Sequence, residues 1–391
     1  MTKKLAFSII LLSFTFLVTL LILNMANAKL GLAISGGNLS FCLLLFAVCS
    51  LLYMIRVDVS SGRHLESESI LFTLSCVPTF LCTLSHVDDT YGALALLTLP
   101  LGLFLGKQLC RNHIKSKHPD LFLSIILLPA FVLWAHLATI ALKSPKTIVS
   151  GRDCMFYICM FAPLLYHYRN YVLRTCTILL FTLLIIISAK RSLLIAILLT
   201  TCIYYARFVF EKKIPFWKKN IYITSCLCLI FIFVMNVNIS EVSNQGSFSI
   251  MIDRMSNMND QSNQQRGYIY EIIFNEYINS PFLNIVFGHG CNAVAKNIFG
   301  HPAHNDILEL LYDYGLCGTL FYALFYIKAT LLLLKSIGSR MCAYSDYVYL
   351  FITLVLILIL SMGNCIATNP IINLFLIICL GWNTEFIYNK K

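Results

Sequence analysis

Long apolar runs alternate with short polar segments along most of the chain. Twelve of these runs approach the roughly 20 residues that a helix needs to cross a bilayer. They are centred in the windows 5–24, 38–55, 70–85, 91–106, 121–142, 154–166, 175–189, 193–208, 221–236, 314–334, 347–362 and 370–388. The pattern therefore predicts an all-α polytopic membrane protein with about twelve transmembrane helices.

One polar segment, 236–313, is much longer than the others and divides the chain into three parts. About nine of the predicted transmembrane helices precede it in 1–235, and about three follow it in 314–391. Asn, Ser and Gln dominate the first part of this segment, 236–265, as in a solvated stretch of chain. We therefore expect one large loop between two groups of membrane helices.

The second part of this loop has the pattern of an amphipathic helix. After Arg266, apolar residues recur at helical spacing until Ser280 and Pro281 end the run. These apolar residues are Tyr270, Ile273, Phe274 and Tyr277. The helix is expected to lie on the membrane or on the helical bundle. Turns are expected at Gly288–Gly290 and Gly300–Pro302.

Composition and charge agree with a membrane protein and set its orientation. Only 12% of the residues are charged and 59% are hydrophobic, whereas a soluble domain has roughly 25% charged residues. The net charge of +11 comes from basic clusters between apolar runs. Most Lys and Arg residues fall in the loops on the same side as the two termini, which predicts cytoplasmic termini and a periplasmic loop. This distribution gives no reason to expect nucleic acid, and the 16 cysteines lie mostly in apolar runs as small hydrophobic residues.

Three of the nine histidines lie close together at the end of the loop, at positions 289, 301 and 304. Because imidazole titrates near neutral pH, His304 is a candidate general base or hydrogen-bond donor. The alternatives for His304 are a helix cap or a metal site with His301 and Asp306, although one acid beside two histidines is a weak metal pattern. His289 has the position of a turn residue, and Asn305 that of a helix cap. No metal site is predicted.

Four basic residues on the predicted periplasmic side are candidates for binding an anion. Lys190 and Arg191 stand between two apolar runs, where charge is costly and often functional. They form either an anion site, with phosphate or pyrophosphate as the natural ligand, or a snorkelling hairpin turn. Arg266 and Arg254 in the loop are either solvated surface charges or a second half of a diphosphate clamp.

The end of the loop carries a spacing that is similar to that of a known superfamily. His304 and Asn305, then Leu308, then Gly315 and Gly318 resemble the HN-x-x-L-x(6)-G-x-x-G signature of the O-antigen ligases and O-antigen polymerases. About twelve spans with one large external loop in the C-terminal half also resemble this superfamily.

Two further elements resemble the same superfamily. Arg266–Gly267, a helix, Pro281 and the turn Gly288–Gly290 are similar to its loop pattern of arginine, helix, proline and Gly-x-Gly. Ser188–Ser192 is similar to its Ser-Arg-Gly element, with Ser192 in place of the common glycine and a lysine before the arginine. The specific likeness covers roughly a quarter of the chain.

This resemblance implies a GT-C-like membrane enzyme without a cofactor. Members take a glycan from undecaprenyl pyrophosphate on the periplasmic face of the inner membrane. Ligases transfer the glycan to the lipid A core, whereas polymerases transfer it to a second lipid-linked repeat, in some cases with a chain-length regulator. The resemblance would make His304, Arg266 and Arg191 catalytic. It would place the following residues in substrate binding: Lys190, Arg254, His289, His301 and Asn305.

The sequence of 304–315, HNDILELLYDYG, is more similar to that of the polymerases than to that of the ligases. We therefore expect a polymerase, with a ligase as the alternative. A transporter of lipid-linked oligosaccharides is the alternative from another class. It predicts charged residues within the spans and repeat symmetry. Lys328 is almost alone as a charge within a predicted span, and the sequence shows no internal repeat.

Overall fold

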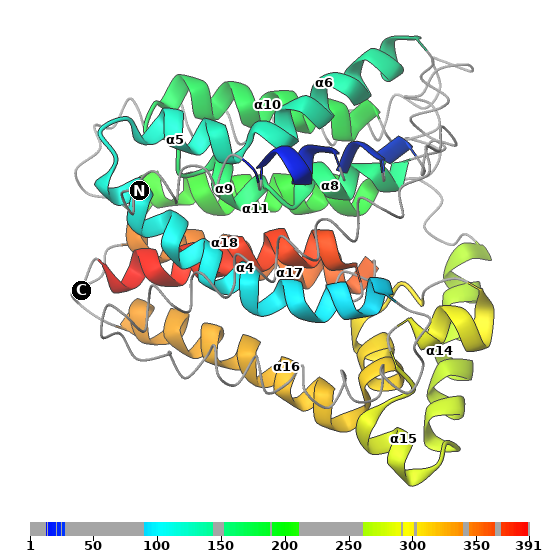
Figure 1. The fold of residues 1–391 in the computed structure, drawn as a ribbon. Helices are drawn as coiled ribbons and strands as arrows, with labels where there is room; N and C mark the ends of the chain where they lie inside the picture. The colour runs from blue at the N-terminus through cyan, green and yellow to red at the C-terminus, as the bar shows by residue number, and fades with distance from the viewer. Residues whose placement is uncertain are drawn as a thin grey trace.

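Long helices that run side by side form most of the structure (Figure 1). The computed structural model describes residues 13–27 apart from 14, 21 and 25, then 90–143, 152–187, 190–210, 261–300 apart from 291, 303–338, 344–363 and 369–389. These described residues are helical or lie in loops, and they contain no strand.

The long helices form a bundle, and shorter helices fill or cover it. The long helices are α4 (Thr90–Lys115), α10 (Tyr171–Ile187), α11 (Arg191–Phe210), α16 (Asp306–Gly338), α17 (Tyr344–Gly363) and α18 (Pro370–Tyr388). The shorter helices on the bundle are α5 (Pro119–Ile126), α6 (Leu128–Lys143), η1 (Arg152–Met155), α8 (Phe156–Cys159) and α9 (Ala162–Leu165).

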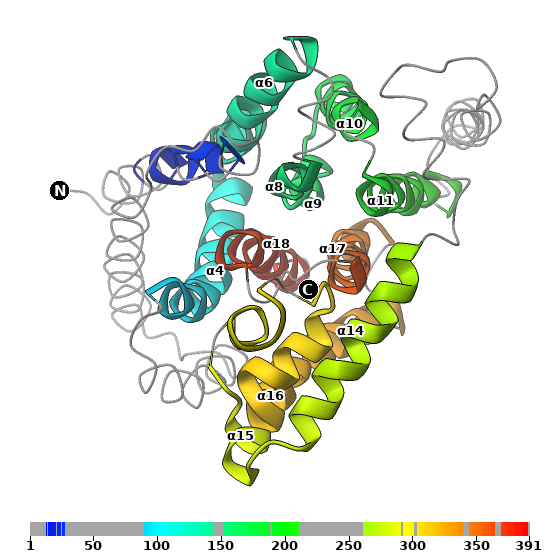
Figure 2. The ribbon, with the colours of Figure 1, turned by 90° about the vertical axis from the view of Figure 1, so that its right-hand side faces the viewer.

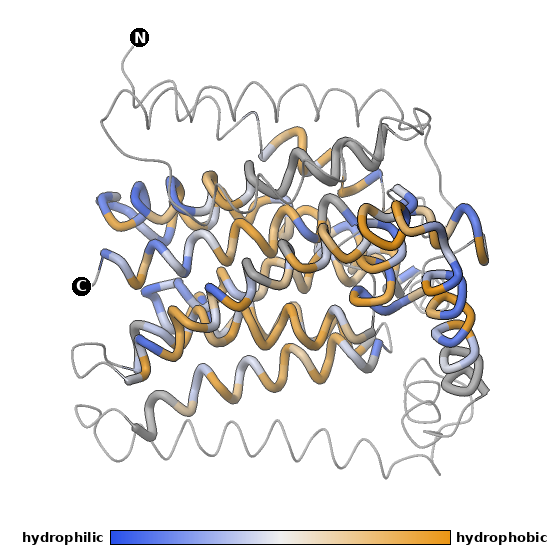
Figure 3. Tube along the Cα trace, turned by 90° about the horizontal axis from the view of Figure 1, so that it is seen from below, coloured by the Kyte–Doolittle hydropathy of each residue, from blue (hydrophilic) through white to orange (hydrophobic). Residues whose placement is uncertain are grey.

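A second group of helices lies across one end of the bundle. It consists of α14 (Gln261–Ile278), α15 (Phe282–Phe287) and η3 (Ala295–Phe299). Together with the first turns of α16, these residues form what we call the loop-side head, residues 261–315. Figure 3 shows hydrophobic residues along the bundle helices and hydrophilic residues gathered toward their ends and in the head. The helix expected after Arg266 is confirmed as part of α14, which begins earlier, at Gln261.

Several predicted helices are confirmed and two expected continuous spans are not continuous. The windows 193–208, 347–362 and 370–388 correspond closely to α11, α17 and α18. The window 121–142 contains α5 and α6 instead of one straight helix, and 154–166 is a chain of short helical turns. The predicted windows 38–55, 70–85 and 221–236 lie outside the described residues.

A membrane span requires both a minimum length and a high hydropathy, and the described residues contain several apolar helices. In that part of the chain, none of the individual helices meets both requirements. The pair α5 and α6, which is bent by 57°, meets them when its two halves are taken together.

Helices α4 and α18 run parallel and pack at very short range because glycines face the partner backbone. A Cβ atom on Gly102 would lie 2.9 Å from the carbonyl oxygen of Leu374, and one on Gly106 would collide with that of Ile378. Gly381 makes the reciprocal approach to Leu103. Small residues spaced by four bring two helix backbones together in this way.

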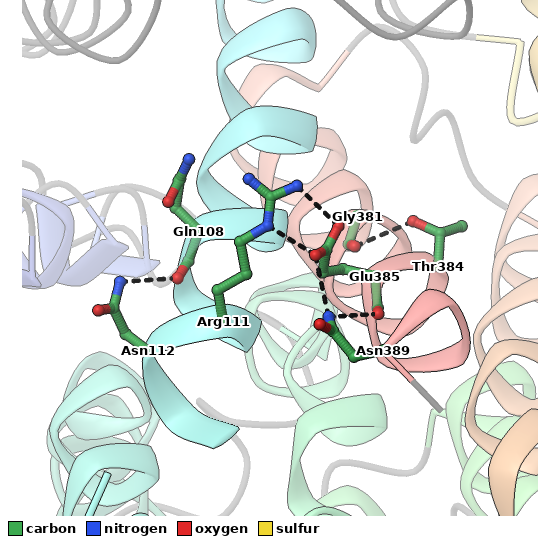
Figure 4. A network of polar contacts seen from close by, with 7 residues as sticks. All are labelled: Gln108, Arg111, Asn112, Gly381, Thr384, Glu385 and Asn389. Carbon is green, nitrogen blue, oxygen red and sulfur yellow. Dashed lines mark hydrogen bonds and ion pairs between the residues drawn. The ribbon is translucent and has the colours of Figure 1, made fainter. Parts of the chain in front are cut away.

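An ion pair closes the far end of this helix pair, away from the head. Nε and Nη2 of Arg111 donate to the two carboxylate oxygens of Glu385, at 2.6 and 3.0 Å (Figure 4). Asn389 donates to the same carboxylate at 2.9 Å. Such a bidentate pair is geometrically specific, and here it fixes the register of α18 along α4.

The centre of the bundle contains polar groups that bond to one another. Viewed along the bundle, α8 and α9 lie in the middle of the helices (Figure 2). Near them His167 Nε2 donates to Asn383 Oδ1 at 2.7 Å, and Asn383 donates to the hydroxyl of Thr353 at 2.7 Å. The His167 ring also stacks on Tyr349. These buried polar groups are satisfied inside the protein, as buried polar groups generally are.

Candidate functional site

Helix α16 is broken at Gly315, and the residues around this break form the backbone part of the candidate site. Gly315 has φ +65°, which is outside the helical region. The carbonyl groups of Tyr312 and Asp313 accept hydrogen bonds from elsewhere: the backbone N–H of His289 donates to Tyr312 at 3.0 Å, and that of Gly290 donates to Asp313 at 2.9 Å. Carbonyl groups at a helix end need such partners. The Gly288–Gly290 turn is thus docked on the broken helix.

Two glycines make this docking possible. Gly288 has φ +83°, in the left-handed region that favours glycine. A Cβ atom on Gly288 would collide with the backbone of Asp313, and one on Gly315 would collide with Gly288 itself. The two glycine elements that the sequence shows separately, Gly-x-Gly in the loop and the glycine of the histidine signature, are therefore one structural contact.

The buried carboxyl group of Asp313 holds the same loop from the other side. Its Oδ1 atom accepts the backbone N–H of Val294 at 3.0 Å. Burial raises the pKa of the Asp313 carboxyl well above its usual range, and the charge of nearby Glu309 raises it further. Backbone N–H groups of Val294, Asn292 and Ala293 act in the opposite direction and lower the pKa.

His289 is held tightly between α14 and α16. Its ring stacks on Tyr312 with the ring centroids 4.1 Å apart. Nδ1 donates to the Tyr312 carbonyl at 3.1 Å, and Nε2 lies 3.1 Å from the hydroxyl oxygen of Ser280. Both ring nitrogens thus have partners within the protein. The contacts fit a role in positioning the loop, and binding of substrate by His289 stays a prediction.

His304 lies immediately before the first turn of α16, in a backbone conformation that is unusual for a side-chain-bearing residue. Its φ is +58°, a left-handed conformation that a non-glycine residue adopts only at a cost. The side chain of Asn305 accepts the backbone N–H groups of Ile307 and Leu308, so Asn305 caps the helix as its sequence position predicts. The cap fixes the point at which the chain turns into α16.

Two further contacts hold the His304 backbone in place. The carboxylate of Glu309, which is 2% exposed, accepts the backbone N–H of Ala303 at 2.6 Å. The hydroxyl of Tyr270, on α14, donates to the His304 carbonyl at 3.5 Å. Glu309 and Asp313 were not among the residues predicted for the site. Acids at positions 306, 309 and 313 share one face of a helix that is otherwise apolar there. This spacing is the sequence pattern that could have identified Glu309 and Asp313 as site residues.

Arg266 lies on the helix that contacts His304. It is four residues before Tyr270 on α14, so both residues are on the same face of that helix. The structure describes the backbone of Arg266 and not its side chain. The two sequence elements that contain Arg266 and His304 are therefore brought together through Tyr270.

Lys190 and Arg191 lie at the N-terminal end of α11. The ammonium group of Lys190 is 4.9 Å from the centre of the Phe156 ring, a cation–π contact with α8. The Lys190 carbonyl accepts the backbone N–H of Leu194, so Arg191 is the first residue of the helix. The N-terminus of a helix favours an anion. The backbone of Arg191 is described and its side chain is not.

The remaining predicted site residues fall outside the described part of the chain. They are Arg254 and His301. Among the residues that the structure does describe, no group of three His, Cys, Asp or Glu side chains is arranged to hold a metal ion.

A broken helix, a docked Gly-x-Gly turn and a histidine with a positive φ before a helix start lie together in this part of the chain. A family model described as O-antigen ligase matches residues 176–323. This range contains Arg191, Arg266 and His304 as well as the contact between Gly288 and Gly315. Over this range, which is less than half of the chain, the protein is similar to the O-antigen ligase family. No curated protein matches the chain.

Proposed function

We propose that the protein crosses the bacterial inner membrane several times, with both termini in the cytoplasm and the loop-side head in the periplasm. The outer surface of the bundle supports this: it exposes large apolar side chains, whereas His167 and Asn383 bond inside it. Apolar side chains that are 54–71% exposed on the bundle include Leu121, Leu183, Leu331, Leu358 and Met362. A surface of this kind fits a lipid environment.

The direction of the helices also supports this topology. The predicted alternation of spans makes α4 and α18 cross the membrane in the same direction, from periplasm to cytoplasm. The contacts from Gly102 to Leu374 and from Arg111 to Glu385 run in parallel order. The parallel packing is thus the one that the proposed topology requires.

We propose that the protein is a glycosyltransferase that polymerises lipid-linked O-antigen repeats. A hydroxyl oxygen of one lipid-linked glycan attacks the anomeric carbon of another. The bond from that carbon to undecaprenyl pyrophosphate breaks, and the electron pair leaves with the pyrophosphate. His304 accepts the proton of the attacking hydroxyl and then releases it to water. An imidazole is suited to this because it gains and loses a proton near neutral pH.

The arginines would stabilise the charge of the leaving group. Guanidinium groups bind phosphate oxygens in a bidentate way and remain charged. Arg191 at the start of α11 and Arg266 on α14 would hold the pyrophosphate between them, aided by the helix N-terminus at Arg191. The observation that carries this proposal is the contact from Tyr270 to the His304 carbonyl, because it brings the Arg266 face of α14 to the histidine.

The test is a lipopolysaccharide gel of a strain that lacks this protein and is complemented with variants. We expect His304→Ala and Arg266→Ala to abolish the ladder, since removal of one preorganised charge donor typically costs about 10²–10³ in rate. Lys335→Ala is the matched control, because Lys335 is an exposed cation at the other end of α16.

The same gel separates the possible activities. Core lipid with a single repeat in the deletion strain means a polymerase. Bare core with long glycan on undecaprenyl pyrophosphate means a ligase, the second candidate, which the description of the family model favours. An unchanged ladder in the deletion strain would contradict both activities and leave transport of lipid-linked glycan as the alternative.

A further inference from the structure

A patch of exposed apolar side chains covers the turn between α14 and α15 in the loop-side head. Helix α15 has the sequence FLNIVF, carries no charge and has no buried residue. Phe282 is 77% exposed and Leu283 is 66% exposed. Ile278 and Phe287 are also exposed. We call these four residues the apolar corner. Large exposed apolar patches mark contact surfaces.

The apolar corner is mounted rigidly. The Tyr277 hydroxyl donates to the Ile285 carbonyl at 2.9 Å, and the backbone N–H of Gly288 donates to Asn284 at 2.7 Å. The backbone contact between Gly288 and Gly315 ties the end of α15 to α16. The exposure of the corner is therefore a fixed feature of the head, and the corner cannot turn inward without loss of these contacts.

The apolar corner continues a stripe of exposed apolar residues on α16. Leu316, Leu320, Ile327, Leu331 and Leu334 are spaced to share one face of that helix, and they are 46–57% exposed. Helix α15 packs directly on α16. Figures 1 and 2 both place α15 at the outer edge of the molecule, beside the head end of α16. The apolar corner and the apolar stripe on α16 can therefore both face the same surrounding medium.

We propose that the apolar corner is a membrane anchor that inserts into the periplasmic leaflet of the lipid bilayer. Phenylalanine and leucine without nearby charge, at the end of a lipid-facing stripe, suit the boundary between acyl chains and headgroups. Inserted there, the corner sets the depth of α14 and of His304 at the level of the headgroups. This is the depth of the pyrophosphate of a lipid-linked substrate. The proposal rests on the membrane location proposed above.

The experiment measures the depth of single tryptophans in the purified full-length protein, reconstituted in phosphatidylethanolamine and phosphatidylglycerol vesicles. Phe282→Trp places a reporter in the apolar corner. Tyr268→Trp is the matched control, because Tyr268 lies nearer the other end of α14 and is also 65% exposed. Emission of the unsubstituted protein, which has three tryptophans, is subtracted.

We expect lipids with brominated acyl chains to quench the Phe282→Trp reporter and aqueous acrylamide to quench it weakly. The Tyr268→Trp reporter should behave in the opposite way. Acrylamide quenching of the two reporters to the same extent, without quenching by brominated lipid, would overturn the proposal. It would leave the corner free for a protein partner or for none.

Activity gives a second readout that does not depend on fluorescence. Phe282→Asp should shorten or weaken the lipopolysaccharide ladder several-fold at unchanged protein level, and Tyr268→Asp should not. A full ladder from Phe282→Asp would also count against the anchor. Failure of the proposed function is distinguishable, because an unchanged ladder in the deletion strain leaves the quenching result standing.

Discussion

The α4–α18 pair and the loop-side head both depend on glycines that let two backbones touch, yet they use the contact differently. In the helix pair, Gly106 and Gly381 face an intact neighbouring helix whose backbone hydrogen bonds remain within the helix. In the head, Gly315 breaks its own helix, and the released carbonyls bind a loop. The first contact supports the whole bundle, whereas the second positions one short segment beside His304.

This difference predicts which substitutions destabilise the folded protein and which lower only its activity. Damage between two continuous helices separates large surfaces and should lower the free energy of unfolding. Damage at the broken helix releases a loop and should leave the bundle intact.

Gly106→Ala should have the largest effect on stability. The added Cβ atom would collide with the carbonyl oxygen of Ile378, so α4 and α18 must move apart. Overpacking typically costs about 1–3 kcal/mol, and a collision with backbone is expected to lie at the upper end of this range. The measurement is thermal unfolding of the purified protein in detergent. The control is Gly267→Ala on α14, where nothing lies within 4 Å. Equal melting temperatures for the Gly106 variant and the unsubstituted protein would contradict close packing of α4 on α18.

Gly315→Ala should abolish activity and leave the amount of protein in the membrane unchanged. The added Cβ atom would meet the backbone of Gly288, so the docked turn must leave α16. A displacement of about 1 Å near reacting groups can lower a rate by roughly 10²-fold. The measurement is the ladder relative to the membrane level of the protein.

Gly300→Ala is the control that separates the cost of a positive φ from the cost of a steric collision. Gly300 also has a positive φ, +70°, but nothing lies within 4 Å of an added Cβ atom. It should therefore show only the cost of a left-handed alanine, about 1–2 kcal/mol. Equal activity of the two variants would mean that the Gly288–Gly315 contact does not matter for the reaction.

Glu309→Ala should reduce activity by a smaller amount, and Glu309→Gln should restore it. The alanine variant leaves the buried N–H of Ala303 without an acceptor, which costs about 1–3 kcal/mol. The glutamine side chain keeps an oxygen at the same place. Glu309 is thus expected to be a positioning residue for His304, and the measurement is the rate of polymer formation in membranes. Equal loss in both variants would show that the charge of Glu309, and not its hydrogen bond, is needed.

The bundle helices were predictable because their signal is local. Each of α11, α17 and α18 is a single apolar run, and their predicted windows differ from the structure by at most a few residues. The bend between α5 and α6 has a sequence signal of another kind, because Pro129 in the first turn of α6 has no N–H with which to continue the helix of α5. The apolar run 121–142 continues through the bend and does not show it. The run 154–166 likewise contains a proline, Pro163 at the start of α9, which the apolar pattern alone does not take into account.

The contacts that build the candidate site are not local, so the sequence shows their members and not their pairing. Gly288 and Gly315 are both visible as motif glycines, but nothing in the sequence states that one touches the other. Asp313 binds the backbone of Val294, and a backbone group leaves no trace in a sequence. Similarly, His167 and Asn383 are separated by 216 positions.

The smallest expected effect is the dependence of stability on pH that Asp313 contributes. Burial and the charge of Glu309 raise the pKa of this carboxyl in the folded protein, whereas in the unfolded chain it ionises near pH 3.9. Above that pH the unfolded chain binds fewer protons than the folded protein, so stability falls as pH rises. The decrease continues until the pH passes the folded pKa, where it ends.

Asp313→Asn removes this titration and keeps an oxygen that can accept the backbone N–H of Val294. The stability of the variant should therefore rise relative to that of the unsubstituted protein as the pH rises from 4. The measurement is the difference in melting temperature between the two proteins from pH 4 to pH 8. A difference that does not change with pH would mean that Asp313 ionises alike in both states. The carboxyl group would then be charged in the head, and its contact with Val294 would be a charge-assisted hydrogen bond of the kind that holds Glu309 to Ala303.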